Sequence, residues 1–317
     1  MPKRNSGIPK QSASELVIKL AFSDKYIYKL PDGHRFPIDK YETVKEQLVY
    51  EGTVKESQIV DPGLVDEQWI LQAHTEKYWK SLHELTILEK ERKKIGLPLT
   101  ELSVKRARNS VAGTLFAIDE ALNHGLGINL SGGTHHAYES HGEGFCLLND
   151  LAIGSKYLLN QKLASKILIV DLDVHQGNGT AHIFRKEDRV FTFSMHGKGN
   201  YPIKKEQSDL DIELQDRVSD DEYLSKLQTV LPYLIEKVSP DFILYQSGVD
   251  VMEGDRLGKM ALTKEGVKQR DSFVLNCAKH NGIPLAVTMG GGYSAKFTNL
   301  VEAHCNTVRV GLDLFQS

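Results

Sequence analysis

The segment 171–175 reads DLDVH and follows directly on the apolar run 167–170. A short run of β-branched and aliphatic residues is typical of a buried strand in a parallel sheet. Side chains alternate along a strand, so Asp171, Asp173 and His175 would point to one side. Two carboxylates and an imidazole in a dry environment are costly unless a cation compensates their charge. The sequence therefore predicts a metal, although aspartates that only cap the following turn fit this motif equally well when it is taken alone.

Strand-like and helix-like segments alternate along the rest of the chain, with no visible linker. Helices are expected over about 101–124, 147–160, 219–240 and 263–280 and from about 296, and strands over 127–130, 166–172, 190–194, 242–245 and 284–288. A capping-box signature at 219–222 (SDDE) marks the start of the third helix. The alternation predicts a single α/β domain with a mostly parallel sheet and helices on both faces. We expect residues 1–15 to form a flexible arm and residues 16–317 to form one folded domain.

Composition excludes several classes of protein. The net charge of −3 leaves no general basic field for nucleic acid. Three unclustered cysteines (Cys146, Cys277, Cys305) indicate a reducing compartment and argue against a disulfide framework. The apolar stretch 16–22 is short and interrupted by Lys19, so neither a signal peptide nor a membrane span is expected. A cytoplasmic protein is the expectation.

Polar clusters follow four of the expected strands, and the carboxyl ends of parallel strands meet at one edge of a sheet. These clusters hold the pair His135-His136, the 171–175 segment, Asp250 after Gly248-Val249, and Tyr293 after three glycines. One such cluster is ordinary turn chemistry. Four together indicate a shared functional site.

The chemistry of these residues favours a single metal ion. Asp173, His175 and Asp250 make a set of two carboxylates and one imidazole, which suits zinc with an open fourth position. A second metal would need further carboxylates, but Gly177 and Met252 stand two residues after His175 and Asp250. A metal of this kind lowers the pKa of water and polarises a carbonyl oxygen.

The remaining polar residues fit the roles of base, orienting partner and oxyanion donor. A loop after the Gly-Gly pair could bring both rings of His135 and His136 to the metal, where one serves as general base and acid. Asp171 and Asn178 are available to fix the tautomers of these rings. Tyr293 could donate to a developing oxyanion. A surface-exposed His pair and a core tyrosine are the plain alternatives.

Taken together, these motifs resemble those of the zinc-dependent histone deacetylases, which share the arginase–deacetylase fold with acetylpolyamine amidohydrolases. The motifs, in the order of that family, are GGTHHA at 132–137, GFCLLND at 144–150, DLDVHQGNG at 171–179, GVD at 248–250 and GGGY at 290–293. The likeness runs from about His34 to Val310. The segments around 176–179 and 253–258 look most like the class IV branch and its bacterial relatives.

The resemblance implies a role for each matching residue. It implies zinc on Asp173, His175 and Asp250, a buried pair of His135 with Asp171, His136 as the proton shuttle beside Asn178, and Tyr293 polarising the scissile carbonyl. It further implies a substrate tunnel lined by Gly144, Phe145 and Tyr201, with Leu257 at its rim. It also implies a potassium ion near Asp171, Asp173, His175, Ser194 and Met195, and a second one at the backbone of Phe184, Glu187 and Val190.

Two departures from the class I pattern matter. Asn178 stands where class I enzymes carry an aspartate, which predicts a more neutral resting His136. The acidic loop residue that holds the substrate backbone in class I has no match in the segment 80–98.

The expected function is removal of acetyl or longer acyl groups from lysine side chains of proteins, with no nucleic-acid or membrane partner. The alternatives are deacetylation of small molecules such as acetylpolyamines, and a non-catalytic scaffold that binds acyl-lysine. Acyl length, target protein, oligomeric state and the choice between zinc and iron stay open.

Overall fold

The computed structural model describes residues 17–316, so the flexible arm predicted for 1–15 lies outside the described residues. Its centre is an eight-stranded sheet with the order β2-β1-β3-β8-β7-β4-β5-β6, in which every neighbouring pair is parallel. The strands are β1 Leu20–Ala21, β2 Ile59–Val60, β3 Leu126–Asn129, β4 Ile167–Asp171, β5 Val190–Gly197, β6 Leu210–Leu214, β7 Phe242–Gln246 and β8 Leu285–Thr288. Strands β3, β4, β7 and β8 are buried along their whole length, as parallel strands covered on both faces must be.

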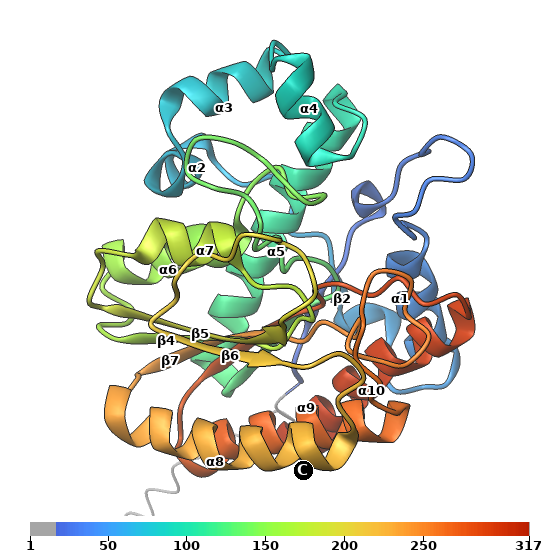
Figure 1. Ribbon diagram of the computed structural model, residues 1–317, viewed down its shortest axis with the longest axis vertical. Helices are drawn as coiled ribbons and strands as arrows, with labels where there is room; N and C mark the ends of the chain where they lie inside the picture. The colour runs from blue at the N-terminus through green and yellow to red at the C-terminus, as the bar shows by residue number, and fades with distance from the viewer. Residues whose placement is uncertain (1–16, 317) are drawn as a thin grey trace, which may run out of the picture.

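Helices cover both faces of this sheet. They are α1 Lys40–Tyr50, α2 Glu67–Ala73, α3 Glu76–His83, α4 Glu89–Ile95, α5 Glu101–His124, α6 Asp150–Asn160, α7 Asn178–Phe184, α8 Asp220–Val238, α9 Lys264–His280 and α10 Phe297–Phe315, with short 3-10 turns at Asp24–Tyr26 and Glu56–Gln58. Figure 1 shows α5, α6 and α7 above the sheet and α8 and α9 below it. None of these helices, within residues 17–316, is long and apolar enough to cross a membrane. The predicted α/β fold with helices on both faces is confirmed.

The helix boundaries follow local capping chemistry. Helix α5 ends where predicted, because Gly125 takes the left-handed conformation that closes a helix, with φ of 83°. Helix α6 starts later than predicted, because the side chain of Asn149 accepts a hydrogen bond from the backbone N–H of Ala152 and so acts as the N-cap.

The capping box predicted at 219–222 does not form. Helix α8 does start there, but the Ser219 side chain makes no capping hydrogen bond. The Asp220 carboxylate instead accepts hydrogen bonds from the backbone N–H and the hydroxyl of Thr263. This contact ties the start of α8 to Thr263, the N-cap residue of α9.

A buried arginine on α9 connects this helix to the edge of the sheet where the polar clusters lie. The Arg270 side chain pairs with Asp271 at 2.7 Å, and both side chains are fully buried. Its guanidinium also donates to the backbone carbonyls of Leu172, Ser247 and Gly248. These carbonyls belong to the segments after β4 and β7, so one side chain supports both of them from below.

We expect Arg270→Met to lower the free energy of unfolding by about 3–5 kcal/mol, because it leaves the Asp271 carboxylate buried and unpaired. Chemical denaturation measures the change. The matched control is Arg217→Met, since Arg217 pairs with Glu253 at 3.1 Å while the two side chains are 75% and 62% exposed. That substitution should cost less than about 1 kcal/mol. Equal losses in the two variants would contradict the structural role of Arg270.

Candidate active site

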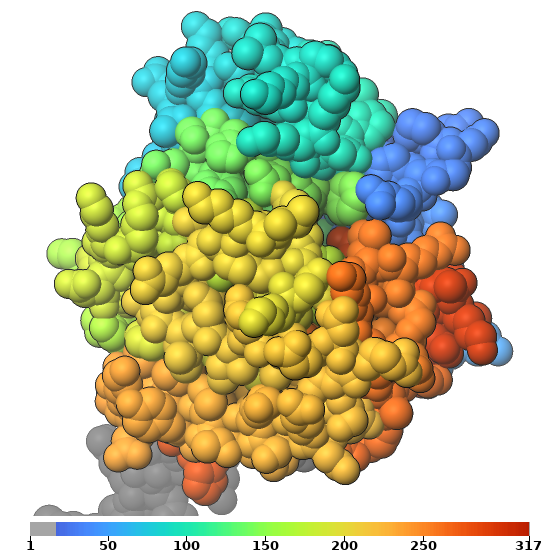
Figure 2. All heavy atoms as spheres, in the orientation of Figure 1, coloured from blue at the N-terminus to red at the C-terminus, as the bar shows by residue number. Residues whose placement is uncertain are grey.

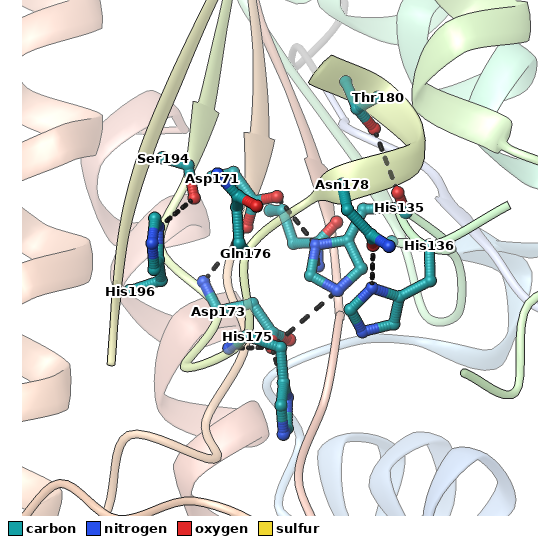
Figure 3. Close-up of polar contacts among 12 residues, drawn as sticks. His135, His136, Asp171, Asp173, His175, Gln176, Asn178, Thr180, Ser194 and His196 are labelled. Atoms are coloured by element: carbon teal, nitrogen blue, oxygen red, sulfur yellow. Dashed lines mark hydrogen bonds and ion pairs between the residues drawn. The ribbon is translucent and has the colours of Figure 1, made fainter. Parts of the chain in front are cut away.

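The carboxyl ends of β4, β7 and β8 bring the predicted site residues together at one edge of the sheet. Asp173 and His175 lie on the segment after β4, and Asp250 lies on the segment after β7. Strands β4 and β7 are direct neighbours in parallel register, with Asp171 opposite Gln246. Figure 3 shows Asp171, Asp173 and His175 to one side of the rings of His135 and His136, with dashed lines that join His135 to Asp171 and to Asp173.

Asp173, His175 and Asp250 form a compact, buried group of metal-ligand type. Their potential ligand atoms all lie within 4.8 Å of one another, the only such group found within residues 17–316. His175 Nδ1 lies 3.0 Å from Asp173 Oδ1 and 3.2 Å from Asp250 Oδ2. The three predicted zinc ligands are therefore brought together, as two carboxylates and one imidazole.

The electrostatics of this group fit a bound cation. Burial opposes a charge on His175, but hydrogen bonds to Asp173 and Asp250 outweigh it and raise its pKa to about 10. Burial, together with the charge of Asp173, raises the pKa of Asp250 to about 7. Positive charge is thus stabilised between the two carboxylates. This donor set fits zinc.

A glycine lets the backbone approach these carboxylates closely. The backbone N–H of Gly291 donates to Asp173 Oδ2 at 2.7 Å. A Cβ atom at position 291 would lie 2.0 Å from Asp250 Oδ2. Any side chain here would displace the Asp250 carboxylate, a predicted metal ligand, so the second glycine of the GGGY motif is required for steric reasons.

The His135-His136 loop is held by the first turn of α6. The Asp150 carboxylate accepts hydrogen bonds from the backbone N–H groups of Gly133 and Thr134, at 3.0 and 2.7 Å. The loop turns so that the rings of His135 and His136 lie with their centroids 4.1 Å apart. Both side chains are buried, so the alternative of a surface-exposed pair is wrong.

The two histidines have different partners and opposite pKa shifts. His135 Nδ1 lies 2.7 Å from Asp171 Oδ2, and the charges of Asp171 and Asp173 outweigh burial and raise the pKa of His135. His136 has no such carboxylate: burial, with the charges of His135 and His175, holds its pKa well below the usual range. A pair of titratable groups pushed apart in this way divides the acid and base roles. His136 is neutral and available as a base.

Asn178, at the start of α7, fixes the tautomer of His136. His136 Nδ1 lies 2.6 Å from Asn178 Oδ1, which can only accept, so Nδ1 carries the hydrogen. The amide nitrogen of Asn178 donates to Glu143 Oε1 at 3.0 Å and to the hydroxyl of Tyr138 at 3.1 Å. These acceptors keep Oδ1 turned toward His136. The lone pair of His136 Nε2 is consequently left free.

Glu143 is a residue that the sequence interpretation missed, although it stands directly before Gly144-Phe145. Burial opposes its charge, but hydrogen bonds from His141, Tyr201 and Asn178 lower its pKa, so it is an ionised carboxylate that can only accept. The signal in the sequence was a charged residue between two glycines, directly before the GFCLLND motif. Asp150 and Arg270 were also assigned no role, because their work is to hold backbone segments.

One cavity of about 330 Å³ contains the predicted tunnel residues and reaches the metal-ligand group. Gly144, Phe145, Tyr201, Leu257, Tyr293, His136 and His175 all line it. Burial, with the charges of Asp250 and Asp173, raises the pKa of Tyr293 well above its usual value, so its phenol stays protonated and able to donate. Its place in the cavity wall separates Tyr293 from an ordinary core tyrosine.

The structure leaves the two predicted potassium sites as predictions. Asp171 and Ser194 lie opposite each other on β4 and β5. The carbonyls of Phe184 and Glu187 accept backbone hydrogen bonds from Glu187 and Val190, in the turn after α7. The carbonyls of Phe184 and Glu187 thus lie in one short turn, and a potassium ion at either position stays a prediction.

Comparison with known proteins identifies the family. The model of the histone deacetylase domain matches residues 34–308. The chain is 40% identical to an uncharacterized protein of Picosynechococcus sp. strain PCC 7002, over 93% of this chain and 99% of that protein. It is 30% identical to histone deacetylase 2 of Arabidopsis thaliana, over 88% of this chain and 75% of the relative. The crystal structure of the HDA15 HD domain superposes with a TM-score of 0.76 at 22% identity, covering 93% of this chain and 88% of that one.

The chain belongs to the histone deacetylase family, as its motifs predicted. The family supports a hydrolase that acts on amides, and its dependence on zinc agrees with the buried group of Asp173, His175 and Asp250. The comparisons do not single out the class IV branch, which stays a prediction.

Replacing the acceptors of the Asn178 amide should release the tautomer of His136. In the double variant Glu143→Leu, Tyr138→Phe, we expect a larger share of His136 with its hydrogen on Nε2, because the amide is then free to turn. The ¹⁵N shifts of histidine-labelled protein report this share directly. Glu143→Gln in place of Glu143→Leu keeps a carbonyl acceptor for the Asn178 amide, so this variant should restore the form of His136 with its hydrogen on Nδ1. The control Glu139→Leu changes a half-exposed carboxylate of the same loop that does not contact Asn178. An unchanged tautomer in the double variant would contradict the role assigned to Glu143 and Tyr138.

Asn178→Asp tests the charge argument separately. A carboxylate beside Nδ1 stabilises the imidazolium, so the pKa of His136 should rise. A base with a raised pKa stays protonated to higher pH, so the acidic limb of the kcat/KM profile should move to higher pH. An acidic limb at the wild-type position would show that His136 is not the titrating base.

Proposed function

We propose that this protein is a zinc-dependent amidohydrolase that removes an acyl group from the side chain of lysine in proteins. One observation carries the proposal: His175 of the metal-ligand group, the neutral His136 and the protonated Tyr293 all line the same cavity. The cavity has the volume of a small-ligand site, and Gly144 and Phe145 form part of its wall together with His136. A side chain with an amide near its end suits a site of this size.

Each residue has a distinct task in the proposed reaction. Zinc held by Asp173, His175 and Asp250 would supply Lewis acidity toward the amide carbonyl and toward water. His136 takes the proton of the attacking water on Nε2 and returns it to the leaving amine. Tyr293 donates its hydroxyl hydrogen to the carbonyl oxygen as negative charge develops there. His135, held by Asp171, stays charged and supports that same negative charge.

The finer predictions belong to this proposal. The class IV resemblance, a cytoplasmic location and the two potassium sites are parts of it that rest on sequence alone. Deacetylation of acetylpolyamines uses the same chemistry and is the nearest rival. A scaffold without activity is disfavoured, because every predicted catalytic side chain is present and the rings of His136 and His175 lie 5.9 Å apart in the cavity.

We expect Tyr293→Phe to lower turnover of an acetyl-lysine peptide by roughly 10²–10³-fold, because one oxyanion donor is lost. Zinc content, measured by elemental analysis, should be unchanged. Tyr233→Phe is the control, since Tyr233 lies on α8, is 56% exposed and is not part of the cavity lining. Full turnover in Tyr293→Phe would remove this residue from the mechanism.

Removal of the metal tests the activity itself. A panel of lysine peptides carrying acetyl to myristoyl groups, with an acetylpolyamine, is assayed before and after dialysis against a chelator. Activity should be lost on dialysis and return with zinc. Activity on the polyamine alone would favour the rival substrate, and activity that survives chelation would contradict the metal-dependent proposal.

A further inference from the structure

The mouth of the cavity is lined by cations and by no carboxylate. Arg35, Lys93, Lys94 and Lys259 are the charged residues of its lining, and all four are exposed. Within residues 17–316, none of the four forms an ion pair. They come from three separate parts of the chain, and Figure 2 shows those parts (blue, teal and orange) on one face of the molecule. We call these four residues the cationic rim.

The end of α4 is fastened to the cavity wall. The backbone N–H of Gly144 donates to the carbonyl of Lys94 at 3.0 Å, and the N–H of Phe145 donates to the carbonyl of Ile95 at 2.7 Å. The backbone that carries Lys93 and Lys94 is therefore fixed beside the tunnel. These two lysines are not on a free-standing helix end.

The other two cations are held at the mouth in the same way. The ring of His34 forms a hydrogen bond of 3.0 Å with the carbonyl of Gly96, which places the adjoining Arg35 next to the end of α4. Lys259 Nζ donates to the carbonyl of Gly199 at 2.8 Å, across the mouth from α4. Each member of the cationic rim thus has a backbone or side-chain anchor.

Two carboxylates lie beside the cavity, but neither forms an ion pair with a rim cation, and both accept hydrogen bonds from other groups. Glu143 accepts from Asn178 and from the hydroxyl of Tyr201. Asp255 accepts from backbone N–H groups, among them that of Tyr293 at 2.6 Å. The four rim cations therefore outnumber these two carboxylates and have no ion-pair partner within residues 17–316.

We propose that the cationic rim selects acyl-lysines that are flanked by aspartate or glutamate in their protein. This inference rests on the proposed lysine deacylase function and names its substrate class. A cleft lined by one sign of charge raises the local concentration of the opposite charge and repels the like charge. Acetylpolyamines and lysine-rich segments are cationic, so the same field disfavours them.

Three acetyl-lysine peptides of equal length test the proposal, with acidic, neutral and basic flanking residues. One exposed ion pair supports roughly a two- to fivefold change. Two or three such pairs should give the acidic peptide a kcat/KM about tenfold above that of the basic peptide. The ratio should approach one in about 1 M salt, where the screening length is about 3 Å. Equal kcat/KM for the acidic and basic peptides at low salt would overturn the proposal.

Variants locate the source of the preference. Lys93→Gln/Lys94→Gln should reduce the ratio several-fold, and Arg35→Gln and Lys259→Gln should each reduce it less. Lys90→Gln is the matched control, because Lys90 is an exposed lysine of the same helix that lies outside the cavity lining. If one variant does not fold, the remaining rim variants decide the test. An acidic-to-basic kcat/KM ratio that is unchanged in every folded rim variant would overturn the assignment of the preference to these four residues.

The neutral peptide separates the two proposals. If wild-type protein does not hydrolyse it, the deacylase function fails; if it does, the acidic-to-basic ratio judges the rim alone. An unacylated acidic peptide and a DNA oligonucleotide serve as competitors. Stronger inhibition by the oligonucleotide would assign the rim to nucleic acid and overturn the proposal, whereas stronger inhibition by the peptide supports it.

Discussion

Burial of two carboxylates next to each other is the constraint on which the site depends. Asp173 and Asp250 are 1% and 0% exposed, and their mutual repulsion in a dry environment needs positive charge between them. His175 supplies part of it, and the donor set leaves the rest to a metal ion. Around these carboxylates lie hydrogen-bonding groups whose role as donor or acceptor is fixed, such as Asn178 Oδ1, which can only accept. Rigid placement of such groups is what distinguishes a reactive site from a merely polar one.

Support for this arrangement comes from side chains that never reach the cavity. Arg270 holds the segments after β4 and β7 by their carbonyls, and Asp150 holds the histidine loop by its N–H groups. Both work through the backbone. The catalytic geometry is thus fixed by polar contacts behind the site as much as by the sheet.

The central sheet and the site residues were predictable from the sequence because their signals are local. The apolar runs of β4 and β7 predict these strands directly, and the polar residues that follow each run predict the position of the site. Strands β1 and β2, at one end of the sheet, were missed because each has only two residues. Strand β6 is half-exposed and lacks a continuous apolar run. The predicted capping box does not form, and the start of α8 is instead linked to Thr263, far along the chain, through Asp220.

The roles of supporting residues could not be predicted, since they depend on contacts distant in sequence. Glu143 meets Asn178 across 35 positions, and Arg270 reaches Leu172 across 98. The cationic rim was hidden for the same reason. Arg35, Lys93 and Lys259 are ordinary surface cations in the sequence and become one group only through folding.

The two hydrogen bonds between the end of α4 and Gly144-Phe145 have a mechanical consequence. The end of α4 carries the Lys94 side chain at the mouth of the cavity. The backbone carbonyls of Lys94 and Ile95 at the same helix end hold Gly144 and Phe145 in the cavity wall. Phe145 adopts a left-handed backbone conformation with φ of 67°, which a bulky residue takes only when its surroundings hold it there. The outer surface that carries Lys94 and the inner wall formed by Gly144 and Phe145 are therefore held together as one unit. A change in the backbone at the end of α4 would therefore alter the charged mouth of the cavity and the position of the Gly144-Phe145 wall together.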